Sequence, residues 1–354
     1  FGAVARRPRS PLGPAGASRC GGVASIVAKG EMMIAAMDGK AFGATVTGVD
    51  LRDLSDAAFA TIRASFLDYG FLLFPGQHLN EQESAEFGRR WGELEFGGQP
   101  LANQRKHKDG TYGDTFDLDS QMMRTNVGNE AWHTDSTYKP VSSKCAMLSA
   151  VVVPHEGGQT ELADMRSAYA ELDQQTRERI ADLSAYHSTN YSQANDLGDF
   201  PESGGEGIYG SVYHGEAYLR PLVKIHPETG IPSLFVGRHA FGIPGLEREE
   251  SRALLRSLIE HVVADERRVY RHDWTPGDTL FWDNRFVLHR ARPYDYSKPR
   301  YLIGTRVAGD PGSELAYYPE DPRAEAGRQA LAAELAMLRT ETADRMYGAT
   351  TAST

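Results

Sequence analysis

The pattern of apolar and polar positions along the chain predicts short strands and helices in turn. Residues 44–49 alternate between apolar and polar side chains, which is typical of a strand with one buried face. Ser55 is a favoured N-cap residue, and apolar residues follow it at helical spacing, so we predict a helix that ends at Gly70. The apolar run 71–74, closed by a Pro-Gly turn, predicts a buried strand.

The remaining chain continues this pattern. Further strands are predicted at 132–138, at 144–153 and in short pieces over 219–309. A helical insertion is predicted at about 164–186, and the polar stretches 92–130 and 187–218 have no clear period, so we expect long loops there. Many short strands with helices around them are typical of a mainly β fold with flanking helices. We expect the double-stranded β-helix, a jelly-roll barrel of the cupin type.

The domain organisation follows from the same pattern. We expect a single jelly-roll domain at 40–310, which contains the insertion, and a C-terminal helical tail at 311–354. The first 30 residues carry five basic residues, no acidic residue and several prolines. That composition is typical of an organelle-targeting leader, but the prolines disfavour an amphipathic helix. For 1–33 we therefore expect a disordered leader or a non-native extension.

Composition and charge narrow the class of protein. Of the 354 residues 40% are hydrophobic, enough for a sizeable core, and the net charge of −10 argues against a nucleic-acid surface or an anionic membrane. No apolar run approaches the roughly 20 residues that span a bilayer. Cys20 and Cys145 suit neither a disulfide framework nor a cysteine metal site. We expect a cytoplasmic protein whose partner is a small molecule, with no nucleic acid or membrane; a homo-oligomer stays open.

The segment 132–135, Trp-His-Thr-Asp, carries the candidate metal chemistry. On an extended strand alternate side chains share a face, so His133 and Asp135 would point to one side about 7 Å apart. Imidazole nitrogen and carboxylate oxygen suit iron, manganese or zinc. His289, which ends an apolar strand, is the natural third ligand. Two histidines and one carboxylate on one face leave open positions, as in non-haem iron(II) oxygenases. Spacing alone leaves other histidines open as partners: His155, His187, His214, His226, His239 and His272.

Several blocks of sequence, over about 44–308, resemble the taurine and 2,4-dichlorophenoxyacetate dioxygenase family, and its phenoxyacetate branch most of all. The blocks lie at 132–136, 147–154, 157–161, 164–169, 277–278, 282–285 and 288–290. Several blocks in the family's order and at its intervals are more specific than any one of them. The resemblance implies a dioxygenase that uses iron(II), 2-oxoglutarate and dioxygen, with His133, Asp135 and His289 as the metal ligands.

The resemblance also implies a site for 2-oxoglutarate. In the family a threonine after a Gly-Gly turn and an arginine beyond the distal histidine hold this co-substrate, and Thr160 and Arg300 match them. A guanidinium can meet the far carboxylate of 2-oxoglutarate with two parallel hydrogen bonds. Arg285 and Arg292 are competing anchors that the family pattern does not favour. The reaction implied is hydroxylation of a small organic substrate with release of succinate and carbon dioxide, because related halogenases carry a small residue in place of Asp135.

The chain departs from the family where the substrate binds. The family's second arginine, four residues beyond the co-substrate arginine, is replaced by Gly304. Strand alternation places Arg306 on the face of Arg300, so Arg306 either anchors an anionic substrate or pairs with an acid at the barrel rim. His214 is a second candidate substrate contact. We expect a phenoxyalkanoate-like acid as the substrate, with an alkyl sulfate, a sulfonate or a natural-product intermediate as the alternative.

Two other classes of protein fit part of the pattern. A zinc- or manganese-dependent hydrolase on the same barrel would need a nucleophilic water and no carboxylate-binding pair. A non-catalytic cupin-like binding or storage protein would need no co-substrate site. The pairing of Thr160 with Arg300 speaks against both classes.

Overall fold

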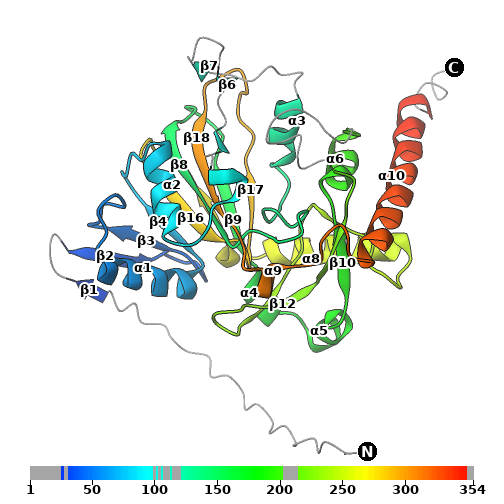
Figure 1. Ribbon diagram of the computed structural model, residues 1–354, viewed down its shortest axis with the longest axis horizontal. Helices are drawn as coiled ribbons and strands as arrows, with labels where there is room; N and C mark the ends of the chain where they lie inside the picture. The colour runs from blue at the N-terminus through cyan, green and yellow to red at the C-terminus, as the bar shows by residue number, and fades with distance from the viewer. Residues whose placement is uncertain are drawn as a thin grey trace, which may run out of the picture.

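The computed structural model describes part of the chain, namely residues 25–27, 31–98, 101–102, 105–106, 112–113, 121–201 and 214–348. In this part the strands form one large sheet and four smaller ones, and helices pack around them (Figure 1). The expectation of sheets with flanking helices is therefore confirmed.

The large sheet has eight strands, and all neighbours run antiparallel except β3 and β4, which are parallel. In spatial order they are β1 (Ser25–Val27), β2 (Met32–Ala36), β3 (Ala44–Thr47), β4 (Phe71–Phe74), β16 (Thr279–Asp283), β8 (Cys145–Val152), β18 (Tyr301–Val307) and β5 (Leu101–Ala102).

The smaller sheets supply the other strands. One has three strands, β15 (Val269–His272), β9 (Thr160–Asp164) and β17 (Val287–Ala291). A second has β11 (Tyr218–Pro221), β10 (Ser184–His187) and β14 (Ala240–Phe241). Two hairpins pair β12 (Val223–Ile225) with β13 (Pro232–Leu234), and β6 (Arg105–Lys106) with β7 (Tyr112–Gly113).

The helices of the described part are mostly short. They are α1 (Asp56–Tyr69), α2 (Glu81–Arg89), α3 (Gln121–Gly128), α4 (Met165–Ala170), α5 (Gln174–Ile180), α6 (Thr189–Leu197), α8 (Arg248–Val263), α9 (Pro311–Glu314) and α10 (Arg323–Gly348), with 3-10 turns η1 (Glu95–Gly98) and η2 (Glu266–Arg268). In Figure 1 α10 lies at the opposite end of the molecule from β1–β3.

The sequence predicted both ends of α1. The Ser55 hydroxyl accepts a hydrogen bond from the backbone N–H of Ala58, which satisfies one of the unpaired donors of the first turn. At the other end Gly70 adopts a left-handed conformation, φ 82°, that suits glycine. A Cβ at Gly70 would lie 2.4 Å from the Phe286 ring. The position therefore requires glycine both for its backbone and for its space.

The N-terminal segment differs from the expectation. Most of the predicted leader, 1–24 and 28–30, lies outside the described residues. Residues 25–27, however, form β1, which pairs with β2 in the register Ser25 to Ile34. The large sheet therefore includes residues ahead of position 40, where the globular pattern was expected to start.

The predicted strand at 132–138 is wrong. His133 alone forms an antiparallel bridge, with His289, and the chain then enters a turn in which Ser136 has a φ of 57°. A left-handed residue cannot continue a strand. The Ser136 hydroxyl is held by Glu95 at 2.7 Å. The alternation of a strand is therefore not what brings His133 and Asp135 together.

The large sheet and the β15–β9–β17 sheet share one core. Leu280 and Trp282 of β16 pack in the same buried cluster as Leu162 of β9 and Val287 of β17. The Trp282 ring lies 4.8 Å from the ring of His289, centroid to centroid. The end of β17 is thus held against the large sheet by aromatic packing.

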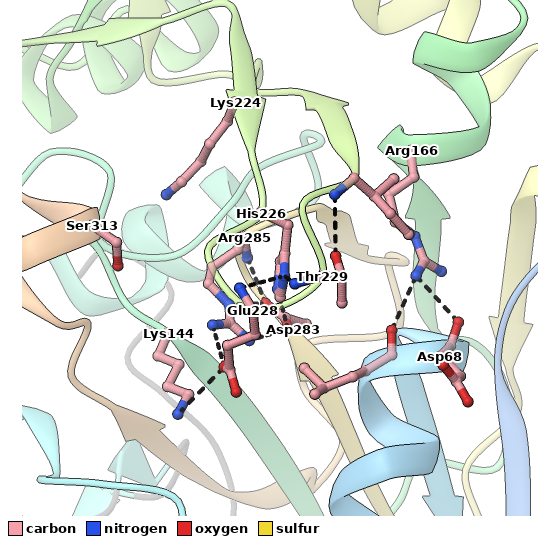
Figure 2. A network of polar contacts seen from close by, with 12 residues as sticks. Asp68, Lys144, Arg166, Lys224, His226, Glu228, Thr229, Asp283, Arg285 and Ser313 are labelled. Atoms are coloured by element: carbon pink, nitrogen blue, oxygen red, sulfur yellow. Dashed lines mark hydrogen bonds and ion pairs between the residues drawn. The ribbon is translucent and has the colours of Figure 1, made fainter. Parts of the chain in front are cut away.

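A buried network of charges joins the end of β16 to the β12–β13 hairpin. Asp283 accepts hydrogen bonds from Arg285 Nε and Nη2 at 2.8 and 2.6 Å, and His226 Nε2 lies 3.2 Å from its Oδ2. Arg285 also donates to Glu228, and Figure 2 shows Lys144 reaching the same carboxylate. Burial raises the pKa of Asp283, but Arg285 and then His226 lower it further, so the net pKa lies below its usual range. The carboxylate is therefore charged and fully paired.

Removing the guanidinium from this network should destabilise the protein. Arg285→Met leaves two carboxylates without their main partner, and a buried pair broken on one side costs about 3–5 kcal/mol. We expect a lower urea midpoint by tryptophan fluorescence. The control is Arg52→Met, whose pair with Asp50 is solvent-exposed and should contribute little.

The same pair gives a pH signature. Because the folded-state pKa of Asp283 is lowered, its stabilisation is present above an ordinary carboxyl pKa of about 4 and is lost as the pH falls below it. From about pH 4 to about pH 2 the urea midpoint of the wild type should therefore fall more steeply than that of Arg285→Met. Parallel curves would show that the pair contributes nothing.

Candidate active site

The structure brings His133, Asp135 and His289 together. One nitrogen or oxygen atom of each lies within 4.8 Å of the others, and all three residues are buried. It is the one such group of histidine, cysteine and acidic side chains in the described residues. The two histidine rings are 4.1 Å apart, centroid to centroid. Two imidazoles and one carboxylate form a donor set that suits iron(II).

Backbone pairing fixes the two histidines. The N–H of each donates to the carbonyl of the other at 2.8 Å, which ties the turn at 133–136 to β17. His133 Nδ1 lies 2.8 Å from the Ala131 carbonyl, which can only accept, so this nitrogen carries the proton. Nε2 of His133 is left with its lone pair. A second partner of this kind is what orients a metal-binding imidazole.

Burial also keeps the imidazoles neutral. It lowers the pKa of His289 to about 3, with Arg306 adding to the effect, and it lowers the pKa of His133 well below its usual range, together with the neighbouring His289. A neutral imidazole is the form that binds a metal ion.

A cavity of about 100 Å³ opens beside these residues. Its described lining includes the three side chains above, residues of the sheets and two asparagines of the α3 region. The lining residues are Asn126, Asn129, His133, Asp135, Ala146, Met147, Leu148, Thr160, Trp282, His289, Arg290, Ala291, Arg300, Gly304, Thr305 and Arg306. The predicted co-substrate pair therefore faces the same space as the predicted metal ligands.

Arg300 is a buried cation without a carboxylate. Among the described residues it has no ion pair, and its hydrogen bond is from Nη2 to the Gly158 carbonyl at 3.0 Å. Its Nε is buried with no partner in that part of the chain. Burial lowers the pKa of Arg300, as expected for a desolvated guanidinium. A buried charge is costly unless an anion meets it, and a dicarboxylic acid such as 2-oxoglutarate fits this donor.

Thr160 has a partner that the sequence did not indicate. Its Oγ1 accepts a hydrogen bond from Trp274 Nε1 at 3.1 Å. An indole N–H only donates, so the hydroxyl proton of Thr160 remains available for a carboxylate. The contact arises because β15 pairs with β9 and sets His272 opposite Thr160. Strand register between distant segments carries no signal in one sequence.

The competing anchors are engaged elsewhere. Arg285 belongs to the Asp283 network, and Arg292 is partly exposed with its Nε 3.8 Å from Glu161. His214 is not among the described residues that line the cavity, and its Nδ1 accepts from the Glu216 N–H at 3.2 Å. Arg306 does line the cavity, and it pairs with Asp135.

One histidine that spacing left open comes near the site. The His239 ring lies 6.1 Å from that of His133, and its Nδ1 lies 2.9 Å from the Ser192 hydroxyl. The other buried neighbour is Asn284, whose Nδ2 lies 3.5 Å from Asp135 Oδ2. Asn284 directly follows Asp283, so the charge network described above supports this contact.

Comparison with known proteins places the chain in a family. Residues 34–306 match the model of the taurine catabolism dioxygenase TauD, TfdA family. The chain is 48% identical over 275 residues to an (S)-phenoxypropionate/alpha-ketoglutarate-dioxygenase of Sphingobium herbicidovorans, covering 78% of this chain and 94% of that protein. A protein with the same description from Delftia acidovorans is 45% identical over 281 residues, covering 78% and 96%.

Solved structures agree. AAD-2 in complex with Mn(II) and N-oxalylglycine superposes with a TM-score of 0.71 at 33% identity, covering 81% of this chain and 99% of that one. None of the helices in the described part of this chain is long and apolar enough to cross a membrane. The chain therefore belongs to the TauD, TfdA family and is a dioxygenase that depends on iron(II) and 2-oxoglutarate.

Proposed function

We propose that His133, Asp135 and His289 hold the iron, that Thr160 and Arg300 hold 2-oxoglutarate, and that the enzyme hydroxylates a phenoxyalkanoate-like acid. The observation that carries this proposal is the buried, carboxylate-free Arg300 in one cavity with two imidazoles and a carboxylate. The substrate class is supported by the two phenoxypropionate dioxygenases, which match over nearly their whole length.

We further propose that the large sheet and the β15–β9–β17 sheet are the two faces of a jelly-roll barrel. Their shared core and the superposition with AAD-2 support this arrangement. The barrel and its insertion would form the single domain at 40–310, with 311–354 as a tail. The cytoplasmic location, the absence of nucleic-acid and membrane partners and the open question of a homo-oligomer stay predictions.

When bound, iron(II) supplies the open coordination positions at which 2-oxoglutarate and dioxygen are used to hydroxylate a C–H bond. The chain's own residues position and shield this chemistry. Arg300 would take the far carboxylate of 2-oxoglutarate with paired N–H groups, and the Thr160 hydroxyl would donate to the same group. Trp282 and Leu148 line the cavity with apolar surface that excludes water.

The site for the substrate's acidic group is proposed with less support from the fold. Arg306 lines the cavity, and His214 lies outside its described lining. Gly304 lines the cavity where the family has an arginine, so the space there is larger. This feature favours the second candidate, an alkyl sulfate, a sulfonate or a natural-product intermediate. In either case hydroxylation at a carbon that bears oxygen would give an unstable product that cleaves.

A succinate assay tests the reaction class and the substrate class together. With iron(II), ascorbate and 2-oxoglutarate, phenoxyalkanoic acids should stimulate succinate formation more than alkyl sulfates, sulfonates or uncharged aromatics. His133→Ala should lower the rate more than about 100-fold, because it removes a metal ligand. His155→Ala is the control, since His155 is fully exposed. The strongest stimulation by a sulfate or a sulfonate would replace the phenoxyalkanoate assignment.

Substitution at Arg300 tests the co-substrate site. Arg300→Gln removes the charge that meets the carboxylate and should raise the KM for 2-oxoglutarate by roughly 100-fold. Trp274→Phe removes only the N–H that orients Thr160 and should raise this KM by roughly 5-fold. Arg292→Gln is the matched control on the protein surface. Equal KM values for Arg300→Gln and wild type would assign the anchor to another residue.

A further inference from the structure

Arg306 lies on the strand that carries Arg300 and Gly304, and its side chain lines the metal cavity. Its Nη2 forms an ion pair with Oδ1 of Asp135, and its Nη1 donates to the Tyr138 hydroxyl at 3.4 Å. The Asp135 side chain is only 3% exposed and that of Arg306 18%. The pair is therefore largely desolvated, and loss of either partner leaves a buried charge without compensation.

The two oxygens of Asp135 have different partners. Oδ1 faces Arg306, whereas Oδ2 lies 3.6 Å from His289 Nε2 and 3.5 Å from Asn284 Nδ2. Oδ2 is therefore the oxygen that faces the imidazole nitrogen of the candidate metal centre. The torsion that turns a carboxylate is soft, so this assignment depends on the groups that hold each oxygen.

The neighbouring acid does not compete for Arg306. Glu95 accepts a hydrogen bond from the Ser136 hydroxyl at 2.7 Å, and its Oε1 lies 3.3 Å from Lys139 Nζ. Both contacts hold the turn that follows Asp135. Glu95 thus fixes the backbone of the turn, and Arg306 fixes the carboxylate that projects from it.

We propose that Arg306 is a positioning residue for the metal centre, which holds Asp135 by Oδ1 so that Oδ2 alone is presented to the iron. This inference rests on the proposed role of Asp135 as a ligand. A carboxylate held in this way is a one-oxygen ligand, which leaves the positions that the co-substrate and dioxygen require. Groups that orient a ligand in this manner contribute to metal affinity.

The same geometry disfavours Arg306 as the main anchor of the substrate. A substrate anion that displaced Asp135 from the guanidinium would set two negative groups side by side in a desolvated space, where their repulsion is strong. It would also release the ligand that holds the metal. We expect an anion anchor to leave Asp135 its partner, and the exchange described here does not.

Mn(II) binding to the full chain, without 2-oxoglutarate or substrate, separates the two roles. Free Mn(II) is counted by electron paramagnetic resonance during a titration. Arg306→Gln should raise the Kd for Mn(II) by about 10- to 100-fold, and Arg306→Lys, which keeps the charge and loses the planar fork, should fall between it and wild type. Arg290→Gln is the matched control, because Arg290 lines the same cavity and pairs with Glu161 instead.

Steady-state kinetics at saturating iron completes the test. If Arg306 positions Asp135, the substrate KM of Arg306→Gln stays within about 3-fold of wild type while kcat falls. An unchanged Mn(II) Kd with a strongly raised substrate KM overturns the proposal and makes Arg306 the substrate anchor. An unchanged Kd with unchanged kinetics overturns it as well. Circular dichroism of each variant at the assay temperature checks that it is folded.

Failure of the proposed function would look different. In that case wild-type protein would not bind Mn(II) in a manner that His133→Ala abolishes, whatever the behaviour of the Arg306 variants. Binding that depends on His133 but is indifferent to Arg306 would sink this inference alone.

Discussion

Two backbone hydrogen bonds between His133 and His289 organise the rest of the structure. They join a turn with no regular secondary structure to β17, which is itself held by β9 and by the packing of Trp282. Because the bonds are made by the very residues that carry the imidazoles, the spacing of the rings is set by peptide geometry rather than by flexible side chains. A site on loops is thereby given the precision of a sheet.

Three buried arginines show how the protein uses charge around this point. Arg285 is matched by Asp283 and Glu228 and ties a hairpin to the large sheet. Arg306 is matched by Asp135 inside the cavity. Arg300 has no matching carboxylate among the described residues. The first supports the fold, the second the metal centre, and the third is open to a ligand. Since buried cations are costly, this gradation separates structural from functional roles more sharply than residue type does.

Much of this could be predicted from the sequence, for identifiable reasons. The ends of α1 follow from Ser55 and Gly70, whose roles are local. The metal residues and Thr160 with Arg300 followed from ordered sequence blocks. Contacts that depend on register or on a turn could not be predicted. Ser136 in a left-handed conformation ended the expected strand, and the pairing of β15 with β9 placed Trp274 on Thr160. Strand alternation put Arg306 on the right face but could not choose its partner.

The solitary charge of Arg300 also constrains how this chain can change over evolution. A nearby residue that mutated to glutamate would give the guanidinium a permanent partner and make the fold more stable. The same change would mimic the co-substrate and block its pocket from within. Stabilising substitutions at this place are therefore inhibitory ones, and drift toward a sturdier protein is opposed by selection for turnover. The walls of the pocket near Gly158 and Tyr294 should accordingly stay free of acidic side chains.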